Sequence, residues 1–387
     1  MKRISSRAVC AKIVLMLLLF CFWGSHAKAE RLKIVPQVNA RTTQDDNVLM
    51  KGEGDTEWRL MPQMSAEYGQ EDWMVSGGAK LDIIRYSELT QFDRENVSGW
   101  VKAKNELDER FSLTMDAKFT QDYTFERELE ESGYQTDKSL RTEQSYIPGV
   151  EWKVTEKDVL SFSASFLDVK YEKREYADYW AGGGVLGYSH ALNDERTRLL
   201  GQFDYRHLVF DRPDGDTLQD TYTLMGGVGY KLTEVIDVRA LIGASYSQTD
   251  YDSNVRGNSE TDNLMSSWDV GGTYTWDKWL FTLSTDRSES PSIYGESTVR
   301  NRVRFSGRYN FTERFSATGE TGYYTTSTEN NDSETYYVNP KLRYNIWEDG
   351  WVAFDYKYLN IFNKEDDRNT DQNRVFLEFG VSFPELF

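Results

Sequence analysis

The stretch Arg374–Phe383 decides the fold, because it reads RVFLEFGVSF and an apolar residue stands at every second position. Its apolar row consists of Val375, Leu377, Phe379, Val381 and Phe383, and the residues between them are Phe376, Glu378, Gly380 and Ser382. Successive side chains of a β-strand point to opposite faces. One face of this strand can therefore meet hydrocarbon while the other is wet, as in the wall of a membrane barrel.

The same alternation recurs along the rest of the chain. Apolar rows of this kind occupy Phe111–Phe119, Leu160–Phe166 and Val352–Tyr358. From about Leu32 to Phe387, two alternating runs joined by a tight polar turn are followed by a longer acidic segment, and this unit repeats. Such a rhythm predicts an all-β, transmembrane, antiparallel up-and-down barrel.

A soluble sandwich or propeller also alternates and is the alternative fold. Six tryptophans weigh against it because they cluster beside the short turns, where an aromatic girdle would anchor a barrel at the membrane surface. They are Trp73, Trp152, Trp276, Trp279, Trp347 and Trp351.

Eight short turns predict eight hairpins. The turns are expected near Tyr68–Asp72, Asn105–Arg110, Val154–Asp158, Leu192–Arg196, Leu232–Val235, Trp276–Lys278, Phe311–Arg314 and Ile346–Gly350. Single runs at Leu32–Ala40 and Arg374–Phe383 bring the strand count to about 18. Short turns are typical of the periplasmic side and long loops of the outside. Long acidic loops are therefore expected at segments that include Arg41–Asp55, Ser87–Asn96, Asp122–Ser139, Asp250–Thr261 and Lys364–Gln372.

The first residues predict a secretory leader. Lys2, Arg3, Arg7 and Lys12 precede the apolar run Ile13–Gly24, which is too short to span a bilayer. Small residues at 27–29 then suggest cleavage before Glu30. We expect residues 1–29 to be a cleaved signal peptide and residues 30–387 to form a single barrel. Both cysteines lie in this leader.

Composition excludes nucleic acid as a partner. The five cationic residues of the leader leave 40 Lys and Arg against 63 Asp and Glu, a formal charge of −23 that repels phosphate backbones. The mean hydropathy of −0.66 fits a barrel, because only alternate strand residues face lipid.

Catalysis and metal or cofactor binding are poorly supported. After the leader, the only histidines are His190 and His207, and alternation places both on or near lipid-facing rows. No pair of histidines has metal-ligand spacing. The acid-rich hairpin Asp211–Asp220 does not match a calcium loop and is expected to be solvated surface. An outer-membrane enzyme is therefore the weakest functional class.

Two motifs resemble known outer-membrane barrels. The terminal Phe387 is similar to the assembly signal of Gram-negative barrels, although Pro384-Glu385 departs from it. The segments Ile34–Val38, Asp45–Val48 and Leu60–Met64 resemble the start of the beta-barrel porin 2 type family, some of whose members accompany exopolysaccharide genes. The resemblance implies a Gram-negative outer membrane, with lipid, lipopolysaccharide and the barrel assembly machinery as partners, and polysaccharide-export proteins as further candidates.

A barrel of this size encloses an aqueous channel. Reading the polar face of each strand inward predicts a mixed but locally basic lining: Arg300, Arg302, Arg304, Arg308, Lys341, Arg343, Lys357, Arg198, Arg206 and Arg239, with Glu320, Asp355 and Glu378 among the acids. Four arginines at period two cost energy unless anions or partners meet them. Alternatively, acids on adjacent strands neutralise them. Trp100, Tyr324 and Tyr337 are candidate lumen aromatics.

The segment Asp122–Ser139 is the third exterior loop in this topology. It carries Glu126, Glu128, Glu130 and Glu131 within a helix-capable stretch. By resemblance to general porins, it would fold into the pore and narrow it opposite the arginines. The alternative is a solvated external loop.

Two functions follow from these expectations. One is a porin-like channel for hydrophilic solutes or saccharides. The other is a conduit for exopolysaccharide secretion that docks periplasmic partners. Polymerase genes beside this gene would favour export, and catabolic genes would favour uptake.

Overall fold

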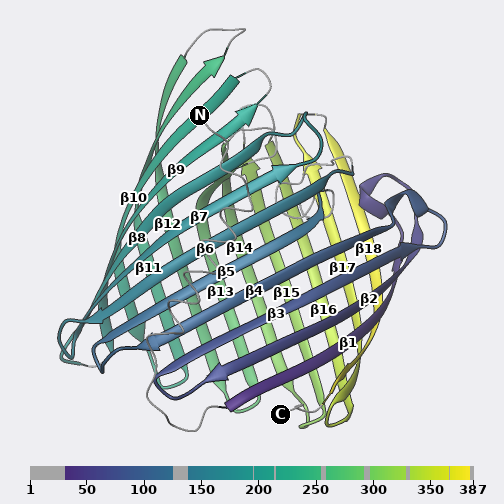
Figure 1. Ribbon diagram of the computed structural model, residues 1–387, viewed down its shortest axis with the longest axis horizontal. Coiled ribbons are helices and arrows are strands. Elements are labelled where there is room, and N and C mark those ends of the chain that lie inside the picture. The colour runs from purple at the N-terminus through teal and green to yellow at the C-terminus, as the bar shows by residue number, and fades with distance from the viewer. Residues whose placement is uncertain are drawn as a thin grey trace.

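The computed structural model describes residues 31–124, 138–194, 196–212, 215–253, 259–291, 297–327, 332–365 and 367–383. They form one sheet of 18 antiparallel strands whose first and last strands pair, so the sheet closes into a barrel (Figure 1). The predicted fold and strand count are confirmed.

The strands follow one another around the wall in chain order. They are β1 (Arg31–Asp45), β2 (Asp55–Gly69), β3 (Trp73–Tyr86), β4 (Arg94–Glu106), β5 (Phe111–Tyr123), β6 (Leu140–Lys153), β7 (Asp158–Tyr171), β8 (Asp178–Ala191), β9 (Thr197–Arg212), β10 (Gly215–Lys231), β11 (Ile236–Ser253), β12 (Ser259–Trp276), β13 (Trp279–Pro291), β14 (Ser297–Asn310), β15 (Phe315–Ser327), β16 (Asp332–Trp347), β17 (Gly350–Asn363) and β18 (Arg368–Ser382). Two short 3-10 helices, η1 (Val48–Met50) and η2 (Thr90–Phe92), lie in the first two long connections.

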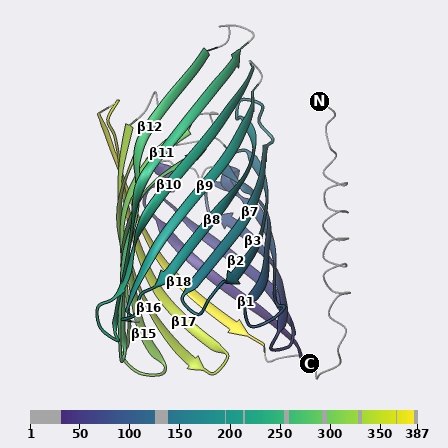
Figure 2. The ribbon, with the colours of Figure 1, turned by 90° about the vertical axis from the view of Figure 1, so that its left-hand side faces the viewer.

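The eight short turns lie where the sequence places them, but the strands extend further at the opposite end. β11 and β12 occupy most of the expected loop Asp250–Thr261, and β9 and β10 occupy most of the acid-rich hairpin Asp211–Asp220. β1 and β18 likewise extend into their expected loops. Polar side chains end the apolar row but not the backbone hydrogen-bond ladder, which continues beyond it. The tall wall of β9–β12 is visible in Figure 2.

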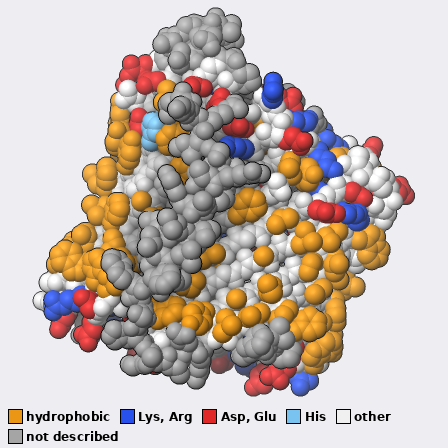
Figure 3. All heavy atoms as spheres, viewed as in Figure 1, with side chains coloured by type: hydrophobic (Ala, Val, Ile, Leu, Met, Phe, Trp, Pro, Cys, Tyr) orange, Lys and Arg blue, Asp and Glu red, His pale blue; other side chains and the backbone are white. Residues whose placement is uncertain are grey.

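The outer face is apolar. Leu264, Leu224 and Ile242 on β12, β10 and β11 are among the most exposed large hydrophobic residues, at 73%, 66% and 64%. Hydrophobic side chains also cover much of the face shown in Figure 3. Within the described residues, no helix is long and apolar enough to cross a membrane.

One tryptophan of the expected girdle is placed differently. Trp152, Trp276, Trp279 and Trp347 are exposed on the outer surface beside short turns. Trp351 instead is buried and lies on the inner face, because it pairs with Gly380 and shares the inward row with Ala353. A Cβ atom on Gly380 would lie 2.4 Å from Trp351 Cε2, so this glycine makes room for the indole.

Candidate functional site

The interior of the barrel is the candidate site. On β14, Val303 and Phe305 are 46% and 41% exposed on the outer surface. The even-numbered residues of the same strand therefore face inward. These include Arg300, Arg302, Arg304 and Arg308, so the four arginines form a column on the lumen wall.

Neighbouring strands compensate part of this column. Arg302 Nε lies 3.0 Å from Asp286 Oδ1 on β13. The Arg300 guanidinium stacks over the Tyr324 ring, 4.1 Å from its centroid. Among the described residues, Arg304 and Arg308 form no ion pair. Asp286 therefore compensates Arg302, and Arg304 and Arg308, nearer the short turns, have no ion-pair partner among the described residues.

A basic groove continues the column toward the short-turn end. It has a volume of about 950 Å³ and is lined by Lys278, Arg308, Arg314, Lys341 and Arg343, with Glu313 as the acid among its lining residues. The Arg343 guanidinium lies 4.3 Å from the Trp351 ring centroid, which holds this cation at the wall. The groove is thus a cationic surface at the predicted periplasmic mouth.

Glu378 joins two inward cations at the seam where the barrel closes. Its carboxylate accepts a hydrogen bond from Arg41 of β1 at 2.9 Å and lies 3.3 Å from Lys341 Nζ of β16. The Glu378 side chain is 6% exposed. A buried carboxylate shared by two cations is fixed in place.

The remaining predicted lining residues also lie on inward rows. Arg239 forms an ion pair with Asp269, and Arg206 contacts Glu289. Asp355 accepts a hydrogen bond from Asn339, and Tyr337 donates one to Glu320 at 2.5 Å. Lys357 lines a cavity beside β1 and β2, and Arg198 is exposed on β9. The described lumen wall therefore combines ion pairs, hydrogen-bonded acids and further cations.

Three sequence predictions concern residues that the structure does not describe. Glu126, Glu128, Glu130 and Glu131 of the predicted constriction loop lie outside the described residues, as do Phe387 and the predicted leader 1–29.

The first long connection, residues 46–54, contributes an inward apolar segment instead. Val48 and Leu49 of η1 are buried against Ile84 and Tyr86 on the inner face of β3. Met50 is buried against inward residues of β17. Leu49 and Met50 adopt left-handed backbone conformations, with φ of 54° and 58°. Bulky residues rarely adopt such angles, so packing must hold them there.

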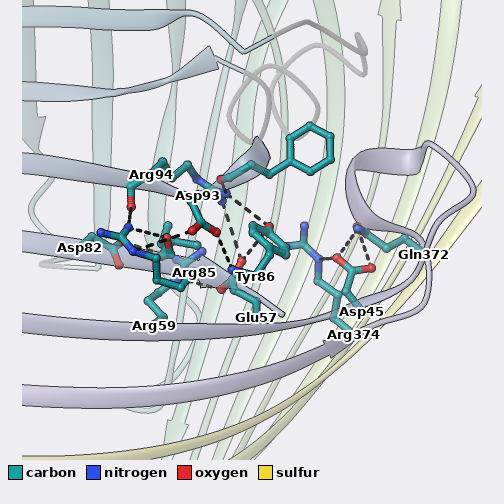
Figure 4. Close-up of polar contacts among 12 residues, drawn as sticks. Asp45, Glu57, Arg59, Asp82, Arg85, Tyr86, Asp93, Arg94, Gln372 and Arg374 are labelled. Carbon is teal, nitrogen blue, oxygen red and sulfur yellow. Dashed lines mark hydrogen bonds and ion pairs between the residues drawn. The ribbon is translucent and has the colours of Figure 1, made fainter. Parts of the chain in front are cut away.

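Polar contacts fix the first end of this connection to the wall (Figure 4). Asp45 accepts hydrogen bonds from Gln372 at 2.8 Å and from Arg374 at 3.0 Å. Gln372 also donates to the backbone carbonyl of Asn47 at 2.9 Å. The connection is thereby attached to β18 at the rim of the lumen.

A second network lines the inner wall next to it. Glu57 accepts hydrogen bonds from Arg59 and from the Tyr86 hydroxyl, both at 3.0 Å, and Arg59 also lies 3.5 Å from Asp82 (Figure 4). Sequence reasoning missed these residues and η1. The one signal in the sequence is alternation, which places the side chains of Glu57, Arg59 and Asp82 on the inner face. No local motif marks the contacts between them.

Neither histidine reaches the lumen. His190 Nδ1 lies 2.7 Å from Asp158 and His207 Nδ1 lies 2.9 Å from Asp220, on outward rows that include Tyr188 and Phe203. In the part of the chain that the structure describes, no cluster of His, Cys, Asp or Glu could hold a metal ion.

The barrel is similar to solved outer-membrane proteins. The ferric citrate transporter FecA in the unliganded form matches with a TM-score of 0.51 and 10% identity, over 88% of this chain and 61% of FecA. OpdK from Pseudomonas aeruginosa matches with a TM-score of 0.45 and 13% identity, over 91% of this chain and 99% of OpdK. A BenF-like porin from Pseudomonas fluorescens Pf-5 gives 0.46 and 10%, over 92% and 99%.

At these identities the likeness shows the fold alone, which is that of an outer-membrane β-barrel. No protein-family model and no curated protein sequence matches the chain. The resemblance to the beta-barrel porin 2 type family is therefore not confirmed.

Proposed function

We propose that this protein is a porin-like channel in the outer membrane of a Gram-negative bacterium and passes small hydrophilic solutes, with a preference for anions. The observation that carries the proposal is the row of inward cations from Arg304 and Arg308 into the basic groove. Fixed charges on a narrow wet wall attract counter-ions and raise their local concentration.

The alternative of a polysaccharide conduit has weaker support. A sugar polymer would pack its rings on open aromatic faces. Tyr324 is only 3% exposed and lies under the Arg300 guanidinium. The Tyr337 hydroxyl is engaged by Glu320. The lumen thus offers cations to a solute more readily than it offers these two aromatic rings.

The apolar outer surface supports lipid and lipopolysaccharide as the surroundings of the barrel. We propose the assembly machinery of outer-membrane barrels as the partner that inserts it, through the terminal Phe387. Export partners would be required only by the polysaccharide alternative.

Conductance in planar bilayers tests the channel. Wild-type protein should give stepwise currents whose reversal potential in a KCl gradient indicates anion preference. Replacing both Arg304 and Arg308 by Gln should reduce that preference, because neither cation forms an ion pair with an acid of the described residues. The matched control is Arg85→Gln, which removes an outward arginine that pairs with Glu95 at 2.5 Å. Absence of stepwise currents from the wild-type barrel would refute the channel.

A further inference from the structure

The barrel wall opens between β12 and β13 at its outer end, while β14 stays paired with β15 as far as Val299↔Ser327. β12 remains paired with β11 as far as Tyr251↔Ser259, but its pairing with β13 stops at Trp268↔Arg287. β13 continues beyond this point to Pro291 and stays paired with β14 up to Pro291↔Ser297. β13 therefore separates from β12 while it stays in one sheet with β14 and β15.

Glu289 shows where this separated end lies. Its carboxylate accepts hydrogen bonds from Gln219 Nε2 of β10 at 2.6 Å and from Ser247 Oγ of β11 at 2.7 Å. Neighbouring strands lie about 4.8 Å apart, so β10 would be about 14 Å from β13 along an unbroken wall. Gln219 and Ser247 both face inward, since Leu218 and Tyr246 beside them are exposed outside. The contacts require the end of β13 to lie inside the barrel, across the inner face of β10 and β11.

Arg206 strengthens this attachment from β9. Its Nη1 donates to the backbone carbonyl of Glu289 at 2.8 Å, and its Nη2 lies 3.9 Å from the Glu289 carboxylate. The Glu289 side chain is 6% exposed, and Gln219 and Ser247 are each 3% exposed. A buried carboxylate with several donors is an anchor rather than a solvated surface acid.

A cavity lies beside the anchored end. Its volume is about 500 Å³, and its charged lining is Asp204, Arg206, Asp269, Asp286, Arg287, Glu289, Arg302 and Arg304. Acids and cations therefore face one another across a space that the separated strands define. Two members of the arginine column, Arg302 and Arg304, line this cavity.

We propose that the separated ends of β13 and β14 form a constriction of the lumen and that Glu289 is the positioning residue that holds them against β9–β11. This inference rests on the proposed channel function. Solutes on their way to the basic groove pass the described ends of these strands, so the anchor sets the width of the pathway. Without it, β13 is free to move back toward the unpaired edge of β12 and to widen the lumen.

Glu289→Ala tests the anchor by conductance. The variant should show roughly double the wild-type single-channel conductance, since the narrowest part of a pore limits the current. Glu289→Gln retains a hydrogen-bonding side chain and should fall between the two. Glu95→Ala is the matched control, because it removes an outward acid that pairs with Arg85 and does not touch Gln219, Ser247 or Arg206. A Glu289→Ala conductance equal to that of wild type would overturn the proposal.

Cross-linking tests the position of the strands independently of transport. The sequence has cysteines only at Cys10 and Cys21. The hydroxyls of Ser247 on β11 and Ser297 on β14 both donate to the Glu289 carboxylate. In the folded, membrane-inserted barrel, Ser247→Cys combined with Ser297→Cys should be joined by a short bifunctional thiol reagent, while each single variant should give no internal cross-link. The joined pair should conduct like wild type. Failure to join the pair would refute the inward position. If neither wild type nor any variant conducts but the cysteine pair is cross-linked, the proposed channel function is refuted and the inward position of the strands is supported.

Discussion

Glu378 of β18 accepts a hydrogen bond from Arg41 of β1 across the seam that closes the barrel. The two residues are also directly opposite in the strand register. Because Lys341 approaches the same carboxylate, one acid compensates two cations that face the lumen. Glu378 therefore links the two strands that close the sheet and also compensates cations of its interior.

Glu378→Gln should lower the free energy of unfolding by about 3 kcal/mol, because removing one partner of a buried ion pair leaves the other charge uncompensated. Guanidinium titration of the detergent-solubilised barrel measures this change. Glu106→Gln is the matched control, since its pair with Lys104 is exposed and should have no measurable effect. Equal unfolding midpoints for both variants would contradict the role given to the seam.

Gly380→Ala should displace the Trp351 indole. A Cβ atom at this position would lie 2.4 Å from Trp351 Cε2 and 2.6 Å from Asn39 Oδ1. Overpacking of this kind costs about 1–3 kcal/mol, which the same unfolding titration would detect. Gly319→Ala provides the control, because no atom lies within 4 Å of its added methyl group. A neutral effect of Gly380→Ala would show that Trp351 moves without cost.

Met50→Ala should loosen the first long connection. Met50 is 1% exposed and packs on Leu359 and Ile361 of β17. Truncating a buried methionine costs about 2–5 kcal/mol, and its left-handed backbone loses the packing that supports it. We expect larger current fluctuations in planar bilayers from a barrel that still folds. Met64→Ala is the control, because Met64 lies on the exposed outer face and its truncation should leave the current unchanged. If Met50→Ala gives no larger current fluctuations than wild type, this connection does not line the solute pathway.

Asp286→Asn should increase anion preference, the opposite of the arginine substitutions. Its carboxylate lies 3.0 Å from Arg302 Nε, so the substitution exposes a compensated cation to the lumen. The reversal potential in a KCl gradient should move toward that of chloride. Glu95→Gln, an outward acid paired with Arg85, serves as control. A shift toward cations would mean that the arginines do not determine selectivity.

Alternation along the sequence was sufficient to predict the strands, the short turns and the face of most residues. It failed where a residue leaves the regular wall. By parity Glu289 belongs to the outward row, opposite to Asp286, yet the separated end of β13 carries it into the lumen. Alternation specifies which face of the sheet a side chain occupies while neighbouring strands stay paired. It does not specify where two neighbouring strands, such as β12 and β13, stop pairing.

The candidate site was harder to predict than the fold for a similar reason. Parity placed Arg300 and Arg302 on one row, but their partners Tyr324 and Asp286 belong to other strands, and only the register brings them together. The inward packing of Val48–Met50 depends on contacts between segments far apart in the sequence. No short sequence motif encodes such contacts.

The separation of β12 from β13 also divides the barrel mechanically. Below Trp268↔Arg287 each strand is paired with both of its neighbours and the backbone forms a closed hoop, so any increase in girth must break ladder hydrogen bonds. Above that pair the described strands form an open collar, and its two edges are coupled through side chains such as Glu289. The collar can therefore change girth by exchanging a few side-chain contacts, while the hoop embedded in the membrane keeps a fixed circumference.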